Sequence, residues 1–141
     1  INNTTSLGTS GLRWTTVFAT NGTINTSDAR EKTNINNLHY GIGTIMKLRP
    51  VSYNWIGKEN EKPKLGLIAQ DLLQTIPEVV ATHEWVPNDE TGELEYHEME
   101  KLGVYYSDLI PVLIKGMQDQ QKQIELLQQQ LEQMQQQLEG K

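Results

Sequence analysis

Apolar positions near the C-terminal end of the chain recur with the seven-residue period of a coiled coil. From Ser107 onward, the first heptad position holds Ile110, Met117, Ile124, Leu131 and Leu138, and the fourth holds Leu113, Gln120, Leu127 and Met134. This spacing predicts a long helix that associates with copies of itself along an apolar seam, in which Gln120 is a polar layer that sets the register. Pro111 falls in the first turn, where its missing N–H does no harm.

The same segment is rich in glutamine between residues 118 and 137, which is also typical of disordered or aggregation-prone tracts. Because the seam positions stay apolar through the tract, we favour the coiled coil. Mixed Ile, Leu and Met at the seam do not select a dimer over a trimer.

The middle of the chain alternates between helical and strand-like patterns. A helix-start signal at Ser27 or Asp28 comes first, with Glu31 at the spacing of a capping box. Further expected elements are a helix in 38–48, strands at 51–56 and 64–70, a helix at 71–76 and a hairpin joining 79–83 to 93–97. These elements predict an α+β fold: a small mixed β-sheet and hairpin region with short helices, followed by the long helix.

Residues 1–26 are rich in Thr, Asn and Gly, and their apolar side chains gather in 12–19. This run of β-forming residues before Asn21-Gly22 predicts a strand or hairpin that cannot bury itself alone. We therefore expect three parts: the end of a β-rich shaft in 1–26, an α+β domain in 27–106 and a coiled-coil helix in 107–141. The first residue is Ile, so we expect a piece of a longer protein.

Composition excludes several classes of function. Only 36% of the 141 residues are hydrophobic, so a single chain has a thin core and oligomerisation would help it. The net charge of −6 argues against nucleic-acid binding, and no apolar run reaches membrane-spanning length. The chain has no cysteine, and its three histidines lack metal-ligand spacing, so we expect no metal and no cofactor.

Ser27 and Lys32 form the candidate catalytic pair. A lysine can activate a serine hydroxyl if it is held neutral, but an ordinary lysine, with a pKa of about 10.4, is protonated at neutral pH. Burial or a neighbouring cation must therefore lower that pKa, and Arg30 is a candidate cation. The competing interpretation is that Ser27 caps a helix and Lys32 is a solvated charge, and residue types alone favour it.

Helix geometry restricts how the pair could meet. Five residues along an ideal helix turn through about 500°, which leaves the two side chains about 140° apart. Ser27 must therefore precede the helix, or the lysine must come from another subunit. Either arrangement ties activity to correct folding.

Five motifs, taken in order, resemble a known family. They are Ser27–Lys32 followed by Ile35, then residues 48–55 (LRPVSYNW), 66–71 (GLIAQD), 77–80 (PEVV) and 106–110 (YSDLI) leading into the coiled coil. This order is similar to the intramolecular chaperone domain of peptidase family S74, which is found at the C-termini of phage endosialidases and tail spikes. The myelin regulatory factor family carries a similar domain.

The resemblance implies a homotrimer that assists folding of the β-rich shaft ahead of it and then releases itself. It places cleavage between Thr26 and Ser27, with Ser27 as nucleophile and Lys32 as base, in a tail-fibre or tail-spike precursor assembled in the bacterial host cytoplasm. Asp28, Arg30 and Asn34 are candidate supporting residues. No nucleic acid or membrane takes part.

Two alternatives remain open. The chain could be a non-enzymatic trimerisation module or receptor-binding fibre tip, or cleavage could release a transcription factor. The upstream segment, which has no basic stretch, disfavours the latter.

Overall fold

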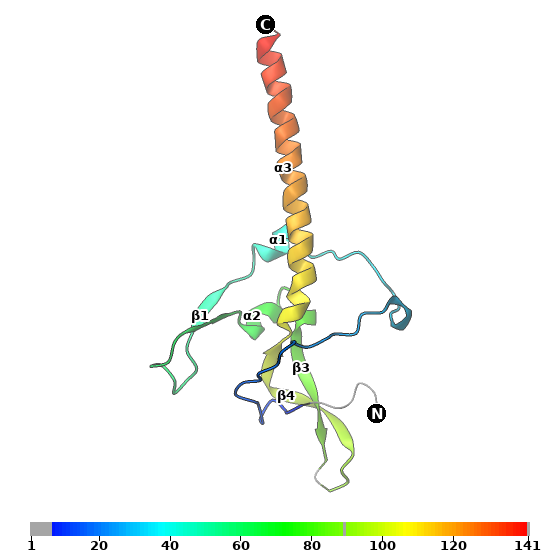
Figure 1. The fold of residues 1–141 in the computed structure, drawn as a ribbon, viewed down its shortest axis with the longest axis vertical. Helices are drawn as coiled ribbons and strands as arrows, with labels where there is room; N and C mark the ends of the chain where they lie inside the picture. The colour runs from blue at the N-terminus through cyan, green and yellow to red at the C-terminus, as the bar shows by residue number, and fades with distance from the viewer. Residues whose placement is uncertain (1–6, 89, 141) are drawn as a thin grey trace. The chain divides into compact units, whose positions relative to one another are not determined.

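The computed structural model describes residues 7–88 and 90–140 and divides the chain into two compact units (Figure 1). One unit combines residues 38–79 with 105–141, and the other combines residues 1–37 with 80–104. Each unit therefore joins segments that are distant in the sequence.

A long helix, α3 (Leu109–Glu139), dominates the first of these units. A 3-10 turn, Tyr106–Asp108, leads into it, close to the start predicted at Ser107 and Asp108. Three residues of its first turns, Leu109, Val112 and Gly116, are buried, whereas the rest of the helix is exposed or half-buried. The predicted C-terminal helix is therefore confirmed.

Helix α1 (Ile42–Ile45) packs against α3 in both views of the ribbon. Two glycines permit this close approach. A Cβ atom at Gly116 would collide with Ile45 Cδ1, and one at Gly41 would collide with the Asp119 carboxylate. The observed helix is shorter than the one predicted in 38–48, because Gly41 has extended backbone and only the next residues enter the helix.

Strands β1 (Val51–Tyr53) and β2 (Lys64–Gly66) form an antiparallel pair in which Val51 lies opposite Gly66. A Cβ atom at Gly66 would lie 2.6 Å from Tyr106 Oη. Glycine therefore makes room for a tyrosine whose hydroxyl accepts a hydrogen bond of 2.9 Å from the Leu67 amide. This bond links the strand pair to the turn that precedes α3.

The core of this unit forms around α2 (Ala69–Leu73) and a 3-10 turn at Pro77–Val79. Leu72 and Ile76 are each 1% exposed. The other buried apolar side chains of the unit are Val79, Leu109 and Val112. Val79 of the PEVV motif and Leu109 at the start of α3 thus both contribute to this core.

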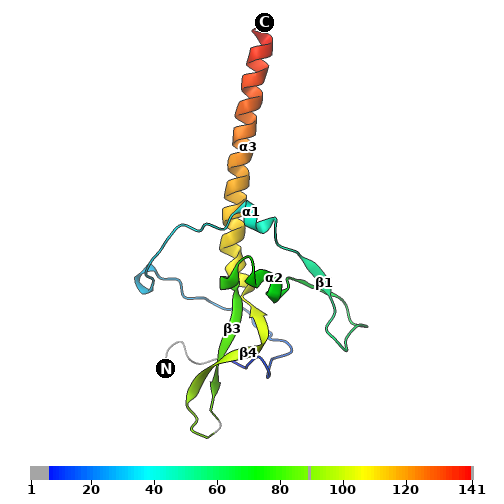
Figure 2. The same cartoon turned by 180° about the vertical axis from the view of Figure 1, so that it is seen from behind.

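The second unit contains the hairpin of β3 (Val80–Pro87) and β4 (Leu94–Val104), which is visible in Figure 2. Its antiparallel register places Trp85 opposite Tyr96 and is shifted between Ala81 and His83. The turn is closed by the Asn88 amide, which donates to the Glu93 carbonyl at 2.7 Å, and Gly92 takes a φ of +71°. The predicted hairpin is confirmed, with longer strands than expected.

The strand predicted in 12–19 is wrong for this chain, because residues 7–26 contain no strand. Phe18, the most exposed of its apolar side chains, is 95% exposed. β-forming residues need a pairing partner, and the described part of the chain gives this run none. The assignment of 1–26 to a β-rich shaft stays a prediction, and residues 1–6 lie outside the described residues.

Antiparallel strand pairs with short helices, followed by one long helix, confirm the predicted α+β fold class. The trimeric coiled coil remains a prediction.

Candidate functional site

The segment that carries the candidate catalytic residues folds as a single short turn. A 3-10 helix spans Ala29–Glu31, and Asp28 caps it by accepting a hydrogen bond of 2.9 Å from the Arg30 amide. The turn ends at Lys32, whose amide donates to the Ala29 carbonyl at 3.2 Å. Ser27 therefore precedes the helix, and Lys32 follows directly after it.

This turn brings the two candidate side chains together within one chain. The Lys32 ammonium donates a hydrogen bond of 2.6 Å to Ser27 Oγ. Of the two arrangements that helix geometry allows, the chain adopts the one in which the serine lies ahead of the helix. The backbone is extended at Asp28 and at Lys32, on either side of the turn, and the side chains of Ser27 and Lys32 meet although they are five residues apart.

Arg30 is paired with Asp28. Its guanidinium Nε lies 3.0 and 3.1 Å from the two carboxylate oxygens of Asp28. Hydrogen bonds from the Arg30 side chain, and then from its amide, lower the pKa of Asp28 below its ordinary value. The same side-chain bond raises the pKa of Arg30. A guanidinium matched to a carboxylate in this way is a weaker source of positive potential for a neighbouring lysine than an unpaired one.

Asn34 lies two residues beyond Lys32 and has a φ of 53°, in the left-handed region that asparagine tolerates better than most residues. Its carbonyl accepts a hydrogen bond of 2.8 Å from the Asn36 side-chain amide. The chain therefore turns sharply just after the candidate pair. Asn34 shapes this bend, while a role as an oxyanion donor stays a prediction.

The pair is exposed to solvent in the single chain. Thr26, Ser27 and Lys32 are all exposed, and Asp28 is half-buried. A serine–lysine contact at the surface has the geometry for proton transfer but lacks the low-dielectric surroundings that favour a neutral lysine.

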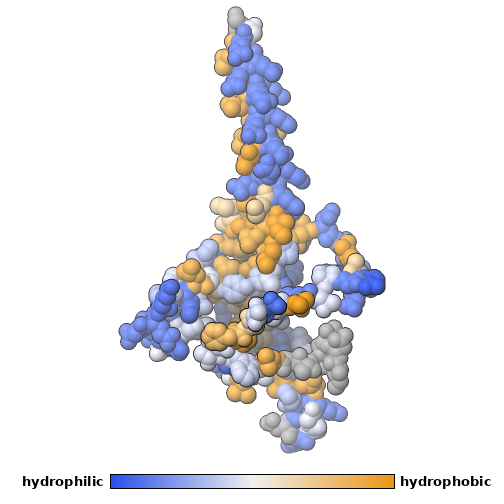
Figure 3. All heavy atoms as spheres, viewed as in Figure 1, coloured by the Kyte–Doolittle hydropathy of each residue, from blue (hydrophilic) through white to orange (hydrophobic). Residues whose placement is uncertain are grey.

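The predicted seam residues lie along α3 and are exposed. Ile124, the least exposed of the eight apolar ones, is 42% exposed, and Leu138 is 76% exposed. Figure 3 shows apolar side chains recurring along one edge of this helix among hydrophilic ones. Gln120 is exposed within the same series. The helix thus carries an uncovered apolar stripe on an otherwise polar surface.

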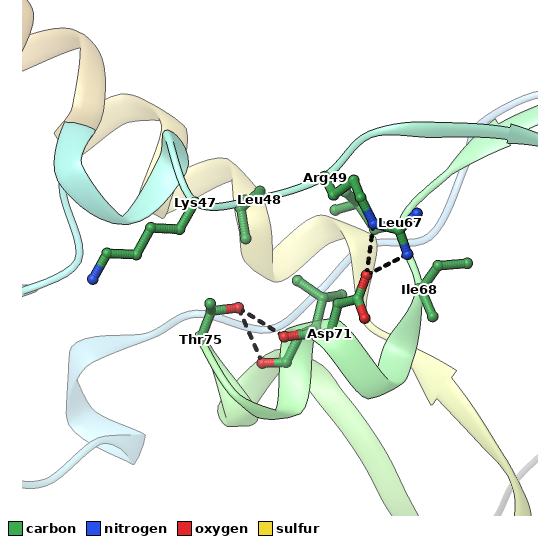
Figure 4. Close-up of a pocket in the computed structure, with 8 residues that line it drawn as sticks. Lys47, Leu48, Arg49, Leu67, Ile68, Asp71 and Thr75 are labelled. Atoms are coloured by element: carbon green, nitrogen blue, oxygen red, sulfur yellow. Dashed lines mark hydrogen bonds and ion pairs between the residues drawn. The ribbon is translucent and has the colours of Figure 1, made fainter.

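Two residues within the sequence motifs form a contact that sequence reasoning did not find. Arg49 of LRPVSYNW pairs with Asp71 of GLIAQD at 2.8 Å. They border a small open pocket together with Leu67, Ile68 and Thr75, as Figure 4 shows. Opposite charges 22 positions apart carry no signal of proximity in one sequence. The contact makes the motifs structural neighbours, and it lies in the unit that holds the core.

The histidines take part in local contacts. The ring of His39 lies tilted against that of Tyr40, and the ring of His83 stacks on that of Tyr96. His97 Nε2 lies 2.9 Å from a Glu95 oxygen. Across residues 7–88 and 90–140, His, Asp and Glu side chains form no group of three that could hold a metal ion. Within the same residues, no helix is long and apolar enough to cross a bilayer.

Comparison with curated proteins found no matching relative. A family model does match: residues 27–81 fit Peptidase_S74, described as chaperone of endosialidase. The match begins at Ser27, the residue before which cleavage is predicted, and it covers the candidate pair Ser27 and Lys32 and four of the five motifs. Residues 27–81 thus match the family that the sequence motifs indicated.

Proposed function

We propose that the chain is a self-cleaving intramolecular chaperone of a phage tail-fibre or tail-spike protein. It trimerises through α3, assists folding of the β-rich segment that precedes Ser27, and then cuts the bond between Thr26 and Ser27. The observation that carries the chemistry is the hydrogen bond of 2.6 Å between Lys32 Nζ and Ser27 Oγ. The family match supports the chaperone role.

The reaction uses these two side chains in sequence. Neutral Lys32 takes the proton from Ser27 Oγ, and the oxygen attacks the carbonyl carbon of Thr26. As the C–N bond breaks, Lys32 returns the proton to the departing nitrogen of Ser27, which leaves an ester. Water then hydrolyses the ester and frees the carboxylate of Thr26. Attack on the Thr26 carbonyl of another subunit would use the same two groups.

Assembly is the proposed switch. Ser27 and Lys32 are exposed in the single chain, where water stabilises the charged ammonium. A partner chain that covered the pair would remove this water and favour the neutral amine, because burial disfavours charge. The uncovered stripe on α3 supports such an assembly, since contiguous exposed apolar surface is typical of an interaction site. Once the chaperone part has left, the shaft cannot unfold along the route by which it folded.

Denaturing mass spectrometry of the assembled protein tests the proposal. We expect fragments of residues 1–26 and 27–141 from the wild type, and whole chains from Ser27→Ala and Lys32→Met. Ser107→Ala is the matched control, because Ser107 is an exposed serine outside the segment, and it should cleave normally. Wild-type chains that stay whole in assembled oligomers would overturn the protease assignment.

A second candidate function is a non-enzymatic trimerisation module or receptor-binding fibre tip. The exposure of Ser27 and Lys32, together with the capping role of Asp28, favours it. In that case the oligomer forms through α3 but Ser27→Ala and wild type have the same mass.

A further inference from the structure

The β3–β4 hairpin contacts the segment upstream of the proposed cleavage site. The carboxylate of Glu84, on β3, accepts a hydrogen bond of 2.7 Å from the Ser10 amide and a second one from the Ser10 hydroxyl. Ser10 and Glu84 belong to the same compact unit. They are 74 positions apart, and the bond between Thr26 and Ser27 lies between them.

Ser10 is presented by a turn that forms within the upstream segment itself. The Thr9 amide donates to the Leu12 carbonyl at 3.1 Å, and the Leu12 amide donates to Thr9 Oγ1 at 3.1 Å. Gly8 has a φ of +88°, and a Cβ atom there would lie 2.7 Å from the Leu12 carbonyl oxygen. The amide and hydroxyl of Ser10 are therefore held in place to bind one carboxylate together.

Among the described residues upstream of Ser27, burial is confined to this turn. Residues 8–10 are half-buried, whereas residue 7 and residues 11–26 are exposed. Glu84 is also half-buried, and the Ser10 hydroxyl and then the Ser10 amide lower its pKa below the ordinary value. Hydrogen bonds to an ionised group are stronger than those between neutral groups. The turn at 8–12 is thus held against the hairpin through Ser10.

We propose that Glu84 tethers the upstream segment to the hairpin, so that the two fragments stay associated after the bond between Thr26 and Ser27 is cut. Cleavage and separation are then distinct steps: cleavage removes the covalent link, and the fragments part only when Ser10 leaves Glu84. The tether also keeps the upstream chain close to the chaperone while it folds. This inference rests on the proposed function for the origin of the cut, but the contact can be tested without autoproteolysis.

The test uses the full chain carrying Ser27→Ala, in which exposed residues 20–25 are replaced by the recognition sequence of a site-specific protease. After external cutting, the half-life of the complex between the two fragments is measured by native mass spectrometry at neutral pH. We expect Glu84→Ala to shorten this half-life about tenfold or more, because two bonds to a charged group are lost. Glu84→Gln, which keeps an acceptor without the charge, should shorten it less.

Two further variants keep the outcome interpretable. Ser10→Ala removes one donor from the other side of the contact and cannot unfold the hairpin, so a shorter half-life there excludes hairpin unfolding as the cause. Glu100→Gln alters an exposed carboxylate on β4 of the same hairpin and should leave the half-life unchanged. Fragments that separate at once without any Glu84 substitution, or that stay together equally well in Glu84→Ala, would overturn the tether. Failure of self-cleavage in the wild type would overturn only the proposed function.

Discussion

The two compact units of this chain are stabilised by different kinds of contact. In the unit of residues 38–79 and 105–140, apolar side chains such as Leu72 and Ile76 are almost fully enclosed. In the described residues of the other unit, the contacts beyond the hairpin are hydrogen bonds and ion pairs, as between Ser10 and Glu84 or Asp28 and Arg30. Val80 is the buried apolar side chain there, among the residues described.

This difference has a consequence for the candidate chemistry. The serine and lysine lie in the unit with little buried surface, while the apolar stripe for assembly lies on α3 in the unit with the core. The proposed assembly surface and the proposed cleavage site therefore belong to different units. The following four predictions test this division.

The largest effect should come from the seam. The double variant Leu127→Gln, Leu131→Gln should convert the proposed oligomer into single chains. Every chain would then place two polar side chains in the proposed apolar interface. Sedimentation equilibrium measures the mass. The double replacement of Leu126 and Gln130 with Asn, outside the seam, is the control and should leave the oligomer assembled. A seam variant of unchanged mass would contradict the coiled coil.

The next largest effect should be on stability, in the core of the unit that contains α2 and α3. Leu72→Ala should lower the free energy of unfolding by about 2–5 kcal/mol, because Leu72 is 1% exposed and its truncation leaves a cavity in the core. Urea denaturation at a fixed protein concentration measures the change. Leu126→Ala, at a position 55% exposed, should cost under about 0.5 kcal/mol. Equal losses for both variants would mean that the core is not where the structure places it.

A smaller effect is expected at the turn that holds the candidate pair Ser27 and Lys32. Asp28→Ala removes both the cap and the partner of Arg30, and we expect self-cleavage to slow about tenfold. Asp28→Asn keeps a capping acceptor but loses the charge, so it should slow cleavage less. The rate is followed by the appearance of the 27–141 fragment. If Asp28→Asn is as slow as Asp28→Ala, the ion pair matters more than the cap.

The smallest effect concerns pH and the packing of α1 on α3. The pKa of Asp119 is lowered from its ordinary value, chiefly by the hydrogen bond from the Lys115 side chain. The charge of Lys115 and then a hydrogen bond from the Ile42 amide lower it further. A lowered folded-state pKa contributes stability that is complete above the ordinary carboxyl pKa and is lost as pH falls through the folded value. Asp119→Asn should therefore be less stable than wild type at neutral pH.

The wild type and Asp119→Asn should converge in stability as the pH falls through the folded-state pKa of Asp119. Thermal unfolding measured across this range checks the sign. A difference that grows toward acid would show that Asp119 does not act through its charge. Glu139→Gln, at the exposed end of α3, is the matched control and should follow the wild type throughout.

The sequence by itself determined the long helix, the hairpin and a helix start at Ser27 or Asp28, of which the structure uses Asp28. These elements are marked by local features: a seven-residue apolar period, a turn-rich linker between two β-forming runs, and a capping residue. Local features can be recognised in a single sequence. The motif order also sufficed to indicate the family whose model residues 27–81 match. The strand predicted in 12–19 failed because pairing depends on a partner that local sequence does not specify.

Only the tertiary structure decided which distant residues meet. It joined Arg49 to Asp71, set Tyr106 against Gly66, and placed Ser10 on Glu84. It also showed that the three-residue turn after Ser27 is tight enough for Lys32 to reach back to the serine, where an ideal α-helix would have separated them. Contacts of this kind depend on chain reversal and on the space left by single glycines, and neither is encoded in the spacing of residue types.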